Sequence, residues 1–152
     1  MIHKKDLTPY QLDVLNAKIC PYCKSHTRIT NEAEIYGGRT FSGNAIIACV
    51  NYPACDAYVG THKDGSTLGR LANQRLRLIK KECKEPFNRL WQLKFLHRDV
   101  CYEQLSEYLG LHPSLTHFGM FGIESCEKAS KWAIAKLIEL SNKEKSIVNT
   151  KS

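Results

Sequence analysis

Two pairs of cysteines dominate the first part of this 152-residue chain. The first pair is Cys20-Pro21-Tyr22-Cys23, and after 25 residues the second is Cys49-Val50-Asn51-Tyr52-Pro53-Ala54-Cys55. Two short Cys-to-Cys spacings separated by a longer gap are typical of a tetrahedral four-cysteine zinc site, in which each pair lies on its own tight turn. The proline and asparagine residues between the cysteines favour such turns. We therefore predict one structural Zn²⁺ bound by Cys20, Cys23, Cys49 and Cys55.

A metal would matter for folding, because zinc binding contributes about 10–16 kcal/mol in zinc-finger peptides. Two other interpretations of the cysteines are small buried side chains and disulfides. The chain has seven cysteines, an odd number, and its charged start, Met1 to Asp6, is not followed by an apolar run. Both features argue against secretion and disulfides. We expect a reducing compartment, the cytoplasm.

The positive charge of the chain is concentrated in one segment. Residues 63–98 carry ten Lys and Arg against three Asp and Glu, whereas residues 1–62 carry six against five and residues 99–152 six against seven. The formal net charge of +7 falls to about +5 when four thiolates bind one Zn²⁺. A basic segment of this kind favours a polyanionic partner, nucleic acid above all. The alternative is a solvated helix face that aids solubility.

Periodicity predicts a zinc ribbon over residues 1–62. Thr8-Pro9 has the residues of a helix start, and this helix should reach about Lys18. Gly37-Gly38 predicts a turn between the first two strands. The predicted strands are Thr27–Tyr36, Thr40–Cys49 and Ala57–Thr61.

From Thr67 the apolar residues recur with helical spacing, and Pro86 should end or kink this helix. Its apolar face comprises Leu68, Leu71, Ala72, Leu76, Leu78, Ile79 and Cys83. Its opposite face, about 100° wide, is basic and comprises Arg70, Arg77, Lys80, Lys81 and Lys84. Arg75 falls within the apolar arc, where it would snorkel, pair with a carboxylate or reach a site.

Two further helices are predicted, Asp99–Leu109, capped by Gly110, and Glu124–Leu140, with an irregular connector over 112–122. The predicted fold class is therefore α+β, with a four-cysteine zinc ribbon packed against three to four helices. The predicted divisions are residues 1–62, a helical region over 63–141, and a disordered tail over 142–152. The chain has no run of eighteen apolar residues, so no membrane span is expected.

Other chemistry-bearing residues give weaker signals. His62 follows the third strand and would serve as a replacement metal ligand, a phosphate contact or an ordinary strand-end residue. A second metal site is conceivable among the remaining cysteines and histidines, but their spacing matches no known knuckle, and core packing is the alternative. These residues are Cys83, Cys101, Cys126, His97, His112 and His117. The chain has no nucleophile elbow, phosphate-binding glycine loop or HExxH motif, so no catalytic residue is predicted.

The two cysteine phrases resemble the C-terminal zinc ribbons of type IA DNA topoisomerases, whose second knuckle is often Cys-Ser-Asn-Tyr-Pro-x-Cys. This resemblance covers about residues 18–61 and implies contact with single-stranded DNA. The chain departs from that pattern at Val50, where Ser is usual, and in its longer gap.

Over about residues 18–138 the chain also resembles an uncharacterised zinc-finger-containing family of phage and bacterial proteins. This resemblance implies the zinc site and the fold boundaries, and it carries no activity. Cys83 and Asn88 stand where His and Asp are expected in such relatives, so no acid–base role is implied there. The phrases that carry it are Tyr58–His62, Leu68–Ala72, Phe87–Trp91 and His117–Phe121, followed by Cys126.

Together these features predict a non-catalytic, zinc-binding accessory or regulatory protein that binds nucleic acid, with single-stranded DNA the favoured ligand. Tyr36, Phe41 and Tyr52 would stack on bases, each stack contributing about 1–3 kcal/mol. The five basic residues from Arg70 to Lys84 would neutralise phosphates. The alternative is a zinc-ribbon adaptor that binds a host or partner protein. A third hypothesis is a nuclease or other hydrolase.

Overall fold

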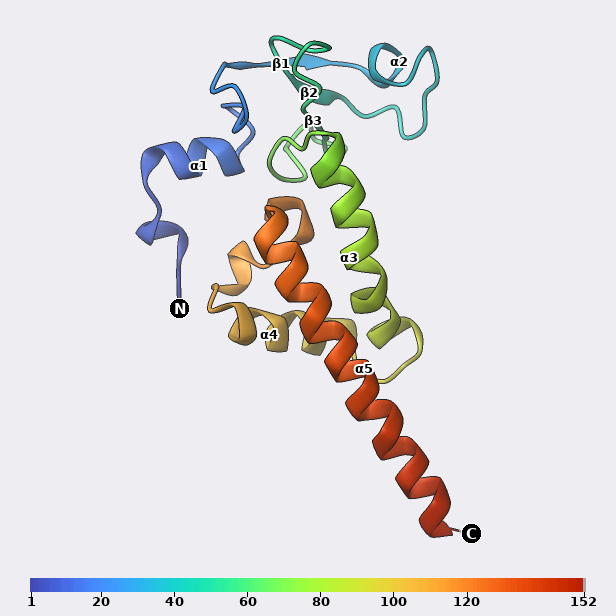
Figure 1. Ribbon diagram of the computed structural model, residues 1–152. Helices are drawn as coiled ribbons and strands as arrows, with labels where there is room; N and C mark the ends of the chain where they lie inside the picture. Colours follow the sequence, from blue (N-terminus) through green and yellow to red (C-terminus); the bar gives the residue numbers. More distant parts are fainter. Residues whose placement is uncertain (152) are drawn as a thin grey trace. The chain divides into compact units, whose positions relative to one another are not determined.

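The computed structural model describes the backbone of residues 1–151 and the side chains of residues 1–145 (Figure 1). It confirms the α+β class, because a three-stranded antiparallel sheet is combined with several helices. The strands are β1 (Thr27–Thr30), β2 (Ile46–Cys49) and β3 (Tyr58–Gly60). The helices are α1 (Pro9–Leu15), α2 (Glu32–Ile35), α3 (Gln74–Gln92), α4 (Arg98–Leu109) and α5 (Ile123–Lys151), with 3-10 turns at Lys4–Asp6, Pro113–Leu115 and Phe118–Met120.

The chain divides into two compact units. The ribbon unit is His3–Arg77, and the helical unit is Leu78–Ser152 together with Met1–Ile2. The division lies inside α3, whereas the sequence predicts it after residue 62. The segment after residue 62 is tied to the sheet because Ala72 forms a bridge with Tyr58 of β3, and a further bridge joins Thr61 and Thr67.

Helix α1 starts where the sequence predicts. The Thr8 hydroxyl accepts the Gln11 N–H at 3.1 Å, and the Gln11 side chain accepts the Thr8 N–H at 2.8 Å. Pro9 occupies the first helical position, where its missing N–H is not needed. These contacts satisfy the first turn of the helix before any tertiary packing.

The sheet has the order β1-β2-β3, but its first two strands are shorter than predicted. β1 ends at Thr30 because the Asn31 side chain accepts the Glu34 N–H at 2.9 Å and caps the short helix α2. Between α2 and β2 the chain forms a loop, in which Gly37, Gly38 and Gly43 have positive φ. The expected tight Gly37-Gly38 hairpin is therefore wrong, and residues 37–45 form a longer connection.

The two faces of the sheet have different roles. Arg28, Ala48 and Tyr58 are cross-strand neighbours on one face, and Ile29, Ile47 and Val59 are neighbours on the other. The second face covers the main core of the ribbon unit and is called the zinc-side face below. That core contains Ala17, Cys20, Cys49, Ala57 and Leu71, with Ile47, Val59 and Cys55 packed against it.

The helix predicted from Thr67 begins only at Gln74. The Asn73 side chain accepts the Leu76 N–H at 3.0 Å, and Asp56 accepts the Gln74 N–H at 3.0 Å. Leu68, Arg70 and Leu71 therefore precede the helix, so they do not share a helical face with Lys80 or Lys84. The helical wheel is wrong for these positions because β-bridge pairing occupies the segment before Asn73.

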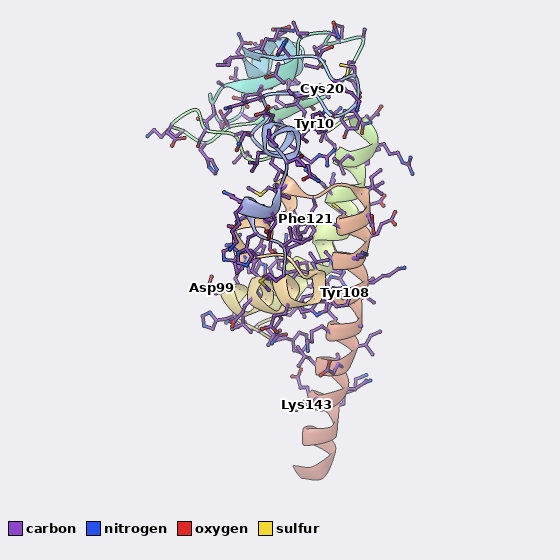
Figure 2. All side chains as sticks on the ribbon, turned by 90° about the vertical axis from the view of Figure 1, so that its left-hand side faces the viewer. Tyr10, Cys20, Asp99, Tyr108, Phe121 and Lys143 are labelled. Carbon is purple, nitrogen blue, oxygen red and sulfur yellow. The ribbon has the colours of Figure 1, made fainter. Side chains whose placement is uncertain are left out.

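The helical unit is built around a cluster of aromatic and aliphatic side chains. Phe87 is fully buried and packs edge to face against Tyr102, with ring centroids 4.8 Å apart. Pro86 lies within α3, which continues to Gln92, so the proline does not end the helix. α4 ends at Gly110 with φ of 68°, as predicted. Figure 2 shows the side chains of this unit, with Asp99 and Tyr108 on α4 and Lys143 on α5.

The backbone of α5 continues as a helix to Lys151, beyond the predicted end at Leu140. Of the predicted disordered tail over 142–152, the side chains from residue 146 onward and all of residue 152 lie outside the described part of the chain. Within the described residues, no helix combines the length and the apolarity that crossing a membrane requires.

Candidate metal centre and aromatic surface

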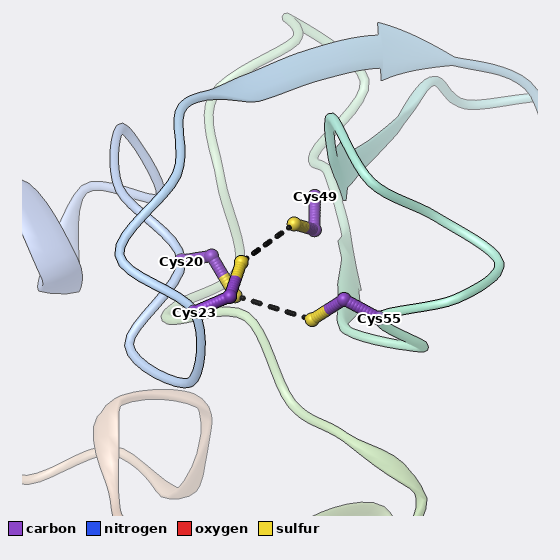
Figure 3. Close-up of side chains that lie close together, drawn as sticks. All are labelled: Cys20, Cys23, Cys49 and Cys55. Carbon is purple, nitrogen blue, oxygen red and sulfur yellow. Dashed lines mark hydrogen bonds between the residues drawn. The ribbon is translucent and has the colours of Figure 1, made fainter.

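The first cysteine pair lies on a tight turn between α1 and β1. The Cys20 N–H donates to the Ser25 carbonyl at 2.9 Å, and the Lys24 N–H donates to the Cys20 carbonyl at 2.9 Å. Lys24 has φ of 63°, the left-handed conformation that allows the chain to reverse here. This turn places Cys20 and Cys23 next to each other (Figure 3).

The second pair begins on β2 and closes a short loop. Cys49 is the last residue of β2, and the Tyr52 N–H donates to its carbonyl at 2.9 Å. The Cys55 N–H then donates to the Asn51 carbonyl at 3.1 Å. Asn51 also donates its backbone N–H to the Cys49 sulfur at 3.4 Å. The loop therefore turns Cys55 back towards Cys49.

The four sulfur atoms converge on one point (Figure 3). The Cys20 and Cys55 sulfurs are 3.6 Å apart, the Cys23 and Cys49 sulfurs are 3.3 Å apart, and all four lie within 4.8 Å of one another. A tetrahedral site with Zn–S bonds of about 2.3 Å has S···S distances of about 3.8 Å. All four are free thiols. The donor set and its spacing therefore fit one Zn²⁺.

The surroundings shift the pKa values of three of the thiols, and not all in the same direction. Hydrogen bonds from the Ser25 side chain and backbone lower the pKa of Cys23 to about 6. Burial raises the pKa of Cys49 to about 12, and burial also raises the pKa of Cys55. A buried thiol of this kind is deprotonated when it coordinates a metal cation. The Asn51 side-chain amide, 3.7 Å from the Cys23 sulfur and 3.0 Å from the Ser25 hydroxyl, supports the site from outside.

The four cysteines form one zinc site, and its chemistry is structural. Four thiolates fill the tetrahedral coordination of Zn²⁺, so no position is left for water or substrate. Cys20 and Cys49 are fully buried, and they belong to the core of the ribbon unit. The metal site is therefore part of the core of the ribbon unit and stabilises it together with the apolar side chains.

The residues considered for other metal roles lie elsewhere. His62 is exposed and is not part of the cluster. Cys83, Cys101 and Cys126 are buried on α3, α4 and α5, and His117 is exposed. Over the described part of the chain, no second group of three or more metal-ligating side chains comes together.

The three aromatic residues predicted to stack on bases are brought together. The Tyr36 and Phe41 rings meet edge to face at 5.2 Å, and Tyr36 also meets Tyr58 at 6.0 Å. Tyr52 meets Tyr58 at 6.2 Å. Tyr58, which the sequence interpretation missed, therefore links Tyr52 to Tyr36 and Phe41. We call Tyr36, Phe41, Tyr52 and Tyr58 the aromatic cluster; Tyr58 places it on the face of the sheet opposite the zinc-side face.

Two of the basic residues predicted to contact phosphate are held by contacts within their own unit. Arg77 donates to the Asp56 carbonyl at 3.0 Å and the Ala72 carbonyl at 2.5 Å, and its guanidinium lies 4.1 Å from the Tyr58 ring centroid. Lys80 donates to the Gly119 carbonyl at 3.0 Å. Arg77 therefore has a structural task, which is to hold Tyr58 and the start of α3 together.

The remaining basic residues differ in exposure. Lys81 and Lys84 are exposed on α3. The helical wheel places Arg75 within the apolar arc. In the structure Arg75 is exposed, so it does not lie on the buried face of its helix. Arg70 is partly buried before the helix, and its Nε has no hydrogen-bond partner among the described residues.

A buried acid that the sequence interpretation missed adjoins the aromatic cluster. The Glu32 carboxylate accepts N–H bonds from Phe41, Ser42 and Gly43. A glutamate in a short polar helix gives no sequence signal for this contact, because its partners are backbone amides nine to eleven residues away.

A model of the family of zinc-finger-containing domains matches residues 16–136, a range that contains all four zinc ligands. No curated protein and no solved structure matches the chain. The resemblance to topoisomerase ribbons therefore stays a prediction, as does a phage or bacterial origin.

Proposed function

We propose that this chain, which belongs to the family of zinc-finger-containing domains, is a non-catalytic accessory protein of phage or bacterial origin that binds nucleic acid. In this proposal the zinc site holds a rigid scaffold, the aromatic cluster stacks on unpaired bases, and exposed lysines of α3 neutralise phosphates. Single-stranded DNA is the favoured ligand, because a duplex keeps its base faces stacked and unavailable to side chains.

The observation that carries the proposal is the aromatic cluster. Four aromatic rings gather in one cluster, in which Phe41 keeps 71% of its surface exposed and the three tyrosines are half-buried. Large exposed aromatics on a rigid support are the usual platform for stacking, because every base offers a π-face.

Lys81 and Lys84 support the proposal from the helical unit. Both are exposed on α3, although the Lys84 ammonium also lies 6.0 Å from the Phe118 ring centroid. Arg77 and Lys80 instead donate hydrogen bonds within the protein. Each phosphate neutralised by a lysine makes binding more dependent on salt. We therefore assign phosphate contact to Lys81 and Lys84.

Fluorescence anisotropy with a labelled single-stranded oligonucleotide, at two salt concentrations, tests both base stacking by the aromatic cluster and phosphate contact by the lysines. Phe41→Ala should weaken affinity about tenfold. Ile29→Ala is the matched control, because Ile29 is 79% exposed but lies on the zinc-side face of the sheet. Equal effects of the two substitutions would refute a role of the aromatic cluster.

The lysines are tested in the same assay. Lys81→Glu with Lys84→Glu should weaken binding and reduce the salt dependence by about two counterions. Lys131→Glu with Lys143→Glu makes the same charge change at exposed positions of α5 and serves as the control. If both pairs weaken binding equally, the effect is one of net charge and the contact assignment is wrong.

The adaptor hypothesis has one observation in its favour. The helical unit leaves Leu93, Ile134 and Ile138 about half exposed, and apolar side chains on a surface can mark a protein interface. Recovery of one stoichiometric protein partner, with no retention of oligonucleotide by the wild-type protein, would favour the adaptor over the proposal above.

A further inference from the structure

The loop that carries Phe41 is tied to a single buried carboxylate. Glu32 is 5% exposed, and its two oxygens accept three consecutive backbone N–H groups. The Phe41 and Ser42 amides each donate to Oε2 at 3.2 Å, and the Gly43 amide donates to Oε1 at 2.5 Å. Successive amides that point at one anion form a recognised type of anion-binding concavity.

Glu32 has no ion-pair partner among the residues whose side chains are described. Burial by itself raises the pKa of Glu32. The hydrogen bonds donated by the backbone N–H groups of Gly43, Ser42 and Phe41 outweigh this effect and lower the pKa below its usual range. The carboxylate is therefore ionised at neutral pH, and backbone amides stabilise its charge.

The loop has few other restraints in this region. The Arg39 N–H reaches the Tyr36 carbonyl at 3.4 Å, and the Asn44 N–H reaches the Ser42 hydroxyl at 3.2 Å. Between these two positions, the described hydrogen bonds of the backbone N–H groups end on Glu32. The Phe41 ring itself makes one edge-to-face contact, with Tyr36, and is otherwise largely exposed.

We propose that Glu32 is a positioning residue for ligand binding, which holds the 41–43 backbone so that the Phe41 ring is displayed beside Tyr36. This inference rests on the proposed function. A loop anchored in this way displays its aromatic ring before the ligand arrives, and less conformational freedom is lost on binding.

The direction in which Glu32→Gln changes the affinity separates this role from a simple effect of charge. Glu32→Gln removes a negative charge, which by itself should strengthen binding to a polyanion. However, both carboxylate oxygens are in use, and the glutamine amide nitrogen cannot accept an N–H bond. The loop then loses at least one restraint, and we expect an affinity about fivefold weaker, a part of the loss expected for one base stack.

Glu34→Gln is the matched control, because it makes the same charge change two residues along α2. Glu34 bonds Arg28 and Thr30 and has no described bond to the loop. This variant should bind the oligonucleotide at least as tightly as the wild type.

A double-substitution cycle tests whether Glu32 acts through Phe41. Oligonucleotide affinity is measured for the wild type, Glu32→Gln, Phe41→Ala and the double variant, with zinc content as the check on folding. Glu32→Gln should weaken binding in the wild-type background and have no further effect in the Phe41→Ala background. An equal loss in both backgrounds, or no loss in either, would overturn the proposal.

Hydrogen exchange gives a readout that needs no ligand. In the full-length zinc-loaded protein, the amides of Phe41, Ser42 and Gly43 should exchange slowly, and Glu32→Gln should accelerate them about tenfold or more, whereas Glu34→Gln should not. Unchanged amide exchange in Glu32→Gln would overturn the proposal that Glu32 holds the 41–43 backbone, even if the affinity falls. If the wild type binds no oligonucleotide, the proposed function fails, and the exchange result still decides whether Glu32 orders the loop.

Discussion

Replacement of one zinc ligand should unfold the ribbon unit, whereas removal of an equally buried cysteine elsewhere should not. Cys49 and Cys101 are both fully buried, and a change to alanine deletes the same sulfur atom in each. Only Cys49 belongs to the zinc cluster. The pair therefore isolates the contribution of the metal from the contribution of packing.

The magnitudes of the two effects differ widely. A structural zinc site contributes about 10–16 kcal/mol. The ribbon unit buries four large aliphatic side chains, which together contribute about 6–12 kcal/mol; they are Val14, Ile46, Leu71 and Leu76. The zinc therefore contributes at least as much as the aliphatic core. Cys101→Ala should cost only about 1 kcal/mol, the cost of a small buried cavity.

The assay combines zinc content by elemental analysis with hydrogen exchange over residues 27–60. Cys49→Ala should lose stoichiometric zinc and the slow exchange of β1, β2 and β3, whereas Cys101→Ala should retain both. A Cys49→Ala protein that keeps a slowly exchanging sheet would refute the reasoning, because the apolar core alone would then be sufficient.

Three further predictions concern the same unit. Asn51→Ala removes the amide beside Cys23 and Ser25 and should weaken zinc affinity about tenfold in a chelator competition assay, since outer-shell contacts typically have effects of this size; an unchanged affinity would contradict this role. Arg77→Ala should lower the free energy of unfolding, measured in urea, by about 1–3 kcal/mol, because it removes the hydrogen bond to Asp56 and the contact with the Tyr58 ring. A change near zero would contradict a structural role of Arg77. Zinc release should increase as the pH falls. The pKa of Cys23 is lowered from 9.0 to about 6, so its thiolate contributes to the stability of the folded site fully above pH 9.0, and this contribution is lost as the pH falls through about 6. Zinc release is followed with a zinc-sensitive dye, and release that does not depend on pH would contradict this prediction.

The zinc site, the start of α1 and the end of α4 could be predicted because they depend on local chemistry. Two cysteine phrases specify a four-thiolate site by spacing alone, and the structure brings all four sulfurs together. Thr8-Pro9 and Gly110 likewise mark a helix start and a helix end through contacts within a few residues. At these positions the local and tertiary preferences agree.

The predictions that failed depend on contacts distant in sequence. The segment before Asn73 has apolar residues at helical spacing, but Ala72 pairs with Tyr58 in the sheet instead. The expected long hairpin is interrupted by α2 and by a loop in which Glu32 accepts the amides of residues 41–43. Neither contact has a periodic signal, so a sequence pattern alone does not reveal it.

The most direct test of this account is X-ray absorption spectroscopy of the purified protein at the zinc edge, together with its zinc stoichiometry. We predict one zinc per chain, with four sulfur neighbours at about 2.3 Å and no nitrogen or oxygen neighbour in the first shell. A protein without stoichiometric zinc, or a site with fewer than four sulfur ligands, would contradict the central claim that one ion joins the two knuckles.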